Sequence, residues 1–133
     1  MDTANPLIVV SAGKSLEKAC EDLQAAVANH QFGVMTTHDL KQTMAKKGVE
    51  FDRECRIFEV CNPHQAKKVL EANIDVSTAL PCRISVYEEA GQVHFSTIRP
   101  TAMIGMFGEG PLTPVAEEVE ATMVAIMNDA AAA

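Results

Sequence analysis

The sequence predicts an α+β domain whose elements follow the order β-α-β-α-β-α-β-β-α. Short apolar runs rich in β-branched residues alternate with longer segments in which apolar residues recur at intervals of three and four. Residue types that begin and end helices stand at the junctions between these segments. The chain has 133 residues and is 47% hydrophobic, enough for one core, so residues 1–133 are expected to form a single domain.

The chain opens with a predicted strand and a predicted amphipathic helix. Residues 7–11 are a short run of mostly β-branched residues, which favours a strand. Ser15 is a typical N-cap, and the residues after it place apolar side chains on one helical face. This face contains Leu16, Ala19, Cys20, Leu23, Ala26 and Val27. We therefore expect Cys20 to be a core residue.

The next predicted unit is a strand followed by a short helix. Residues 32–35 form the expected strand. Thr36 or Thr37 is expected to cap the helix, and Gly48 is expected to end it. Residues 56–61 then form the central strand, with alternate side chains on its two faces.

The junction after this central strand carries a strong helix-start pattern. Asn62 is a favoured N-cap, Pro63 is favoured at the first helical position, and Gln65 completes a pattern like a capping box. The helix is expected over residues 63–72. Cys61 therefore directly precedes a helix N-terminus, where unpaired amides and the helix dipole favour a negative charge.

The second half of the chain is predicted to contain a hairpin, a loop and a last helix. Residues 82–87 and 92–98 read as two strands joined by a turn over residues 88–91. Residues 101–112 are apolar and rich in glycine, and we expect a loop there that takes part in function or subunit contact. A helix with one apolar stripe is expected from Thr113, and residues 129–133 are expected to be a frayed tail.

Charge and cysteine content restrict the class of protein. The formal net charge of −7 disfavours nucleic acid and anionic membranes as partners. The start of the chain has no basic segment, and its apolar run is too short for a signal or membrane segment, so we expect a soluble cytoplasmic protein. Four cysteines with no CxxC spacing are expected to be reduced thiols.

Two cysteines are the candidate chemical groups. Cys61 ends one predicted strand and Cys82 begins another, so their sulfurs meet at one site if these strands are neighbours. A low-pKa thiolate at Cys61 would suit redox or sulfur-transfer chemistry, with Cys61 as the catalytic residue and His64 as a conceivable base. The alternative is that both cysteines are small buried hydrophobic residues.

A soft-metal or haem site is a further alternative. Cys61, Cys82 and His64 are the first candidate ligands, because thiolate and imidazole suit copper(I), zinc or haem iron. The other soft side chains considered are Cys55, His38, Met103 and Met106. A lone CxxH without a second ligand pair is a weak signal, and no GxSxG, HExxH or phosphate loop occurs in the sequence.

Several short motifs together indicate a known family. They are Phe32-Gly33-Val34 with Thr36 and Asp39-Leu40, Arg56-Ile57 leading to Cys61-Asn62-Pro63, Leu80-Pro81-Cys82, and Pro100 followed by Met103. In this order and spacing they resemble the bacterial and archaeal domain of unknown function 302 family. The resemblance implies one antiparallel sheet of about four to five strands with helices on one face, similar to the TATA-binding-protein-like arrangement. It also implies a homodimer, and no established activity.

The sequence therefore predicts a homodimeric binding or accessory domain with a thiol-lined pocket near Cys61 and Cys82. Asn62, His64 and Met103 are the other expected binding residues. The alternative is a thiol-dependent enzyme that uses Cys61, or a soft-metal or haem protein. The sequence leaves open whether the protein is an enzyme.

Overall fold

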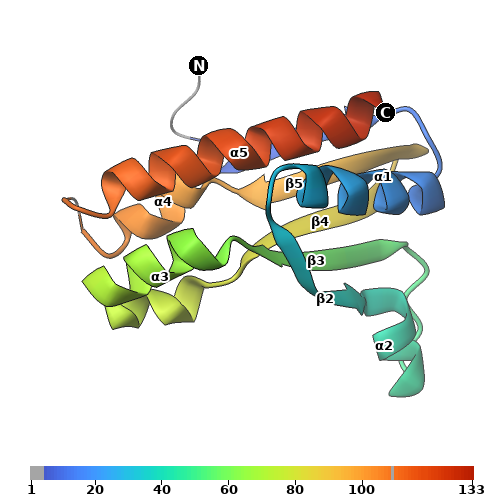
Figure 1. Cartoon of the computed structure of the whole chain (residues 1–133). Helices are drawn as coiled ribbons and strands as arrows, with labels where there is room; N and C mark the ends of the chain where they lie inside the picture. Colours follow the sequence, from blue (N-terminus) through green and yellow to red (C-terminus); the bar gives the residue numbers. More distant parts are fainter. Residues whose placement is uncertain (1–4, 109) are drawn as a thin grey trace.

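The fold is a five-stranded antiparallel sheet with two long helices on one face and shorter helices at both ends of the strands (Figure 1). The computed structural model describes residues 5–108 and 110–133. The strand order is β1-β5-β4-β3-β2, and every neighbouring pair is antiparallel. The elements are β1 (Leu7–Ala12), α1 (Leu16–Asn29), β2 (Gly33–Asp39), α2 (Leu40–Lys46), β3 (Cys55–Cys61), α3 (Pro63–Ala72), the 3₁₀ helix η1 (Ile74–Ala79), β4 (Cys82–Glu89), β5 (Gln92–Ile98), α4 (Pro100–Gly105) and α5 (Thr113–Ala132). The predicted fold class is confirmed.

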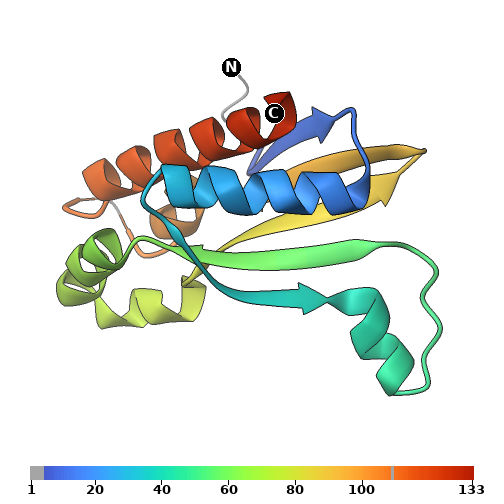
Figure 2. The same ribbon diagram turned by 45° about the vertical axis from the view of Figure 1, so that its right-hand side comes forward.

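The main core lies between the sheet and helices α1 and α5, which run side by side over the same face (Figure 2). Alternate residues of the central strands point toward these helices, as the twofold repeat of a strand requires. The largest fully buried side chains of this core are Leu23, Phe58, Ile84, Phe95, Met123, Ile126 and Met127. Cys20 is also buried there, as the helix pattern predicts.

The predicted start of α2 is wrong. Strand β2 continues through Thr36, Thr37 and His38, and Asp39 is the N-cap, its side chain accepting a hydrogen bond from the Gln42 amide. The three residues pair with β3, and threonine is as suited to a strand as to a helix cap. Pairing with a distant strand therefore decides the local conformation.

Two predictions about the second half of the chain are also wrong in part. The expected loop over residues 101–112 begins as helix α4, with Pro100 at its first position, and Glu109 lies outside the described residues. The expected frayed tail is helical through Ala132. Ala130 is fully buried, and the Lys14 ammonium donates to its carbonyl oxygen at 2.8 Å. A contact with the first loop thus orders the end of the chain.

A second, smaller hydrophobic cluster lies at the end of the sheet where β3 stops and β4 begins. It joins α3, η1, α4 and the start of α5 (Figure 1). Its buried residues are Val69, Val76, Ile104, Leu112 and Ala116. Across the described part of the chain, no helix has both the length and the apolar character needed to cross a bilayer.

Candidate functional site

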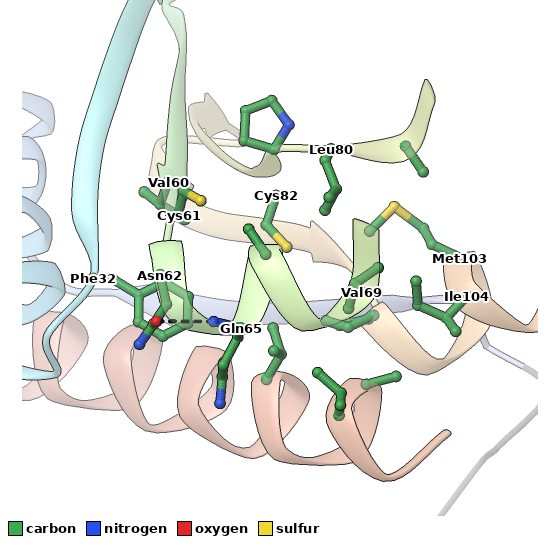
Figure 3. A pocket seen from close by; sticks show the side chains of 17 residues that line it. Phe32, Val60, Cys61, Asn62, Gln65, Val69, Leu80, Cys82, Met103 and Ile104 are labelled. Atoms are coloured by element: carbon green, nitrogen blue, oxygen red, sulfur yellow. Dashed lines mark hydrogen bonds between the residues drawn. The ribbon is translucent and has the colours of Figure 1, made fainter. Parts of the chain in front are cut away.

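A cavity separates the main core from the smaller cluster (Figure 3). Its volume is about 40 Å³. Its walls come from the end of β3, the start of β4 and helices α3, α4 and α5, and they are almost entirely apolar. The lining includes Val60, Val69, Leu80, Met103, Ile104 and Val119. Cys61, Asn62, Gln65 and Cys82 also line it, so the cavity contains both predicted thiols.

The predicted helix cap forms at the N-terminus of α3. The Asn62 side-chain oxygen accepts hydrogen bonds from the His64 amide at 3.0 Å and the Gln65 amide at 3.2 Å, and Pro63 is the first helical residue. These amides are two of the groups that would otherwise stabilise an anion at the helix N-terminus. Asn62 therefore competes with a Cys61 thiolate for the same donors.

The two thiols lie near each other but start from opposite faces of the sheet. Val60 is paired with Cys82, so both side chains point to the face covered by helices. Cys61 follows Val60, so its side chain starts from the other face. Figure 3 shows the Cys82 sulfur pointing in among the lining side chains and Cys61 at their edge. Cys61 also lines a separate open groove between β2 and α3.

The acidity of both thiols is shifted away from the thiolate form. Burial raises the pKa of Cys61 above its ordinary value. Burial, followed by the nearby Cys61, raises the pKa of Cys82 from 9.0 to about 11. Burial acts against the low-pKa thiolate expected for Cys61, and Asn62 already takes two of the amides that would stabilise that thiolate. Both shifts favour the neutral thiol over the thiolate.

The remaining predicted ligands are dispersed. Met103 lines the cavity. His64 is exposed on the first turn of α3 and is outside the cavity lining, and His38 and Cys55 lie on β2 and β3. Met106 is 81% exposed. Within residues 5–108 and 110–133, no three His, Cys, Asp or Glu side chains converge in a way that could hold a metal ion.

Sequence reasoning missed Gln65 as a site residue. It lines the cavity, and its side-chain oxygen is buried and has no hydrogen-bond partner among the described residues. From the sequence, Gln65 is predicted only as part of the cap pattern, although Asn62, Gln65, Ala66 and Val69 follow the spacing of one helical face. This spacing was the available signal that the four residues face the same space.

One antiparallel sheet backed by helices, with an apolar cavity where two central strands meet three helices, defines a small single-sheet α+β protein. The chain belongs to the family described as Domain of unknown function DUF302, whose model matches residues 8–130. It is similar to the crystal structure of an uncharacterized conserved DUF302 protein from Bacillus stearothermophilus. That match has 28% sequence identity and a TM-score of 0.90, and covers 94% of this chain and 98% of the other. No curated protein matches the chain.

Proposed function

We propose that this chain is a binding protein whose thiol-containing cavity near Cys61 and Cys82 takes a small apolar ligand. The observation that carries the proposal is the lining of the cavity, which is hydrocarbon and neutral thiol on nearly every side. Small-molecule sites are typically apolar with a few placed polar groups. A volume of about 40 Å³ gives room for roughly three water-sized groups, so the ligand has about three or four non-hydrogen atoms.

The polar side chain in the cavity wall indicates what else the ligand carries. The Gln65 side-chain oxygen accepts no hydrogen bond within the described structure. This oxygen is sealed from the cavity surface, so a donor on the ligand reaches it only if the Gln65 side chain rotates. An unmet buried acceptor costs about 1–3 kcal/mol, which such a hydrogen bond would recover. A water molecule is a poorer occupant because it needs two to four polar partners. The favoured ligand class is therefore a small apolar molecule with one hydrogen-bond donor, such as an alcohol.

A thiol-dependent enzyme is the less favoured reading. Nucleophilic or redox chemistry at Cys61 needs a thiolate, and burial acts against it. His64, the conceivable base, is exposed and lies outside the cavity lining. Neutral thiols are soft, polarisable wall groups, which suits binding of an apolar molecule.

Two small probes, 2-propanol and acetone, test this function. Their binding is monitored through the methyl NMR signals of Val69 and Ile104. The two probes have the same number of non-hydrogen atoms, but only 2-propanol donates a hydrogen bond. We expect 2-propanol to shift both signals at several-fold lower concentration than acetone, and Gln65→Met to remove the difference. No response at these methyl groups to either probe, or to xenon, would contradict the proposed pocket.

A cavity-filling variant supplies the matched control. Ala116 is buried on α5 and lines the cavity, so Ala116→Val places two additional carbon atoms in it. Ala121→Val makes the same change at an exposed position of the same helix. We expect Ala116→Val to weaken the response to all three probes at least fivefold, and Ala121→Val to leave it unchanged.

A homodimer in the cytoplasm completes the proposal. The apolar segment 101–112 was the expected subunit contact, but Ile104 and Leu112 are buried within the chain, while Met106 remains strongly exposed. A larger surface than Met106 is needed for a stable dimer. The four cysteines are free thiols, which fits a reducing compartment.

A further inference from the structure

Among residues 5–108 and 110–133, no helix packs on one of the two faces of the sheet. Helices α1 and α5 pack on the opposite face, and α2 lies beyond the end of β2 and β3 (Figures 1 and 2). Exposed antiparallel sheets occur, but their outward residues are then mostly polar and charged. This face is mostly polar as well, but few of its side chains are charged.

Strand register arranges the side chains of this face in rows that run across the sheet. Three of these rows span four or five strands, and Glu89 and Gln92 form a shorter row at the hairpin end. We call the three long rows together the open face. The first row is Ser11, His94, Tyr87 and Cys55. The second row is Val9, Ser96, Ser85, Ile57 and His38. The third row is Leu7, Ile98, Arg83, Glu59 and Thr36.

The open face has almost no charge. Within its three rows, Arg83 and Glu59 are the only residues of the Asp, Glu, Lys and Arg types, so the formal charge of these rows is zero, whereas the whole chain carries −7. Beyond the rows, Glu89 lies at the hairpin end, 4.0 Å from Arg53. One corner is apolar, where Leu7, Val9 and Ile98 are each 42% to 50% exposed. Depletion of charge in the centre of a surface is a mark of protein interfaces. A second copy would meet no net repulsion here, although the chains are acidic.

Several polar groups of the open face bond to each other. The Glu59 carboxylate lies 2.8 Å from His38 Nε2 and 3.5 Å from the Arg83 guanidinium. Ser11 Oγ and His94 Nδ1 form a hydrogen bond of 2.9 Å, and the His94 ring lies 5.4 Å from that of Tyr87. Covering a polar group costs little when its partner is already in place. This face is therefore less costly to remove from water than one whose polar groups rely on solvent.

The open face is large enough for a dimer. Five strands about 4.8 Å apart and three rows about 6.7 Å apart give a footprint of about 24 by 20 Å. With side-chain relief, two such faces would bury on the order of 1,200 Å² in total, which reaches the lower end of specific interfaces.

We propose that a second copy of this chain packs on the open face, sheet against sheet. The inference rests on the proposed homodimer and gives it a location. A twofold axis brings the same patch of both copies together, so the patch must complement itself. The open face meets this requirement because it is neutral, carries both members of its ion pair, and has an apolar corner.

Sedimentation velocity and light scattering on three lysine variants of the full chain test the location. Ser85→Lys places a cation in the middle row, and Val9→Lys places one at the half-exposed apolar corner. Gln24→Lys adds the same charge at an exposed position of α1, on the other side of the molecule. Circular dichroism checks that each variant is folded, and Val9→Lys decides the question if Ser85→Lys does not fold.

The expected result is a wild type with twice the mass of one chain at micromolar concentration. Ser85→Lys and Val9→Lys should raise the dissociation constant at least tenfold, and Gln24→Lys should leave it unchanged. A dimeric wild type whose sheet variants remain equally dimeric would overturn the open face as the interface and leave the homodimer intact. A monomeric wild type would overturn both.

Discussion

Replacing Cys82 with alanine should make the stability of the protein less sensitive to alkaline pH. The Cys82 thiol is only 7% exposed and faces the cavity, and its pKa is raised from 9.0 to about 11. The unfolded chain therefore releases this proton at lower pH than the folded chain. Because the unfolded state then binds fewer protons, the free energy of unfolding falls as pH rises above 9.

The size of the effect follows from the two pKa values of Cys82. The stabilisation is fully present below pH 9. It decreases by about 1 kcal/mol by pH 10, and by about 3 kcal/mol once the thiol is ionised in both states. Cys82→Ala should lack this alkaline loss, while its lost packing lowers stability equally at every pH. Lysine and tyrosine titration is common to both proteins and cancels in the difference.

Urea unfolding between pH 7 and 10.5 measures this difference between the wild type and Cys82→Ala. Reductant is present throughout, and the protein concentration is held constant. Val69→Ala is the control, because it removes buried wall atoms from the same cavity but keeps the thiol. Its stability should be lower throughout and follow the wild-type slope. Parallel pH curves for wild type and Cys82→Ala would refute the raised pKa and the dry environment assigned to Cys82.

Three further substitutions test contacts that hold the helices and the hairpin. Lys14→Met removes hydrogen bonds of 2.7 Å to Asp22 and 2.8 Å to the Ala130 carbonyl oxygen. We expect the free energy of unfolding in urea to fall by about 1–3 kcal/mol and amide exchange at the end of α5 to become faster. Unchanged exchange there would contradict this role of Lys14. Thr101→Val removes a 2.6 Å hydrogen bond to Glu120 that joins α4 to α5. The free energy of unfolding in urea should fall by about 1–2 kcal/mol. An unchanged free energy would show that this bond does not stabilise the fold. Gly91→Ala should cost about 1 kcal/mol by thermal unfolding, because φ is +76° in the hairpin turn; a neutral result would show that the turn adopts another conformation.

Local patterns in the sequence were sufficient to predict most elements of the fold. Ser15 and Asn62 cap α1 and α3 as their sequence contexts predict, because each cap depends on residues within one turn. The errors arose where a distant contact decides. Thr36 belongs to a strand because it pairs with β3, and Ala130 is ordered by Lys14, far away in the sequence. The hydrophobic periodicity of a short sequence window gives no information about either of these distant contacts.

The candidate site was predictable in position but less so in chemistry. The antiparallel register that pairs Val60 with Cys82 brings the end of β3 to the start of β4, as the order of the two motifs suggested. The alternation of strand side chains was the overlooked constraint, since it sends Cys61 and Val60 to opposite faces. Burial was the second overlooked constraint. The enclosure of the cavity by α4 and α5 depends on packing between distant segments, which a pattern along the sequence does not describe. A pair of cysteines at strand ends therefore indicates proximity more reliably than reactivity.

The reaction rate of Cys61 with iodoacetamide, measured against pH, separates a binding site from a thiol enzyme. In a variant with Cys20, Cys55 and Cys82 replaced by alanine, we expect an apparent pKa above that of a free cysteine, because burial raises it. Adding Asn62→Ala to this variant should lower the apparent pKa, because two amides that Asn62 now occupies become available to the thiolate. An apparent pKa below that of a free cysteine would contradict a neutral Cys61 thiol in the cavity lining and would favour nucleophilic chemistry at Cys61. A raised pKa that Asn62→Ala leaves unchanged would show that burial alone sets the acidity of this thiol.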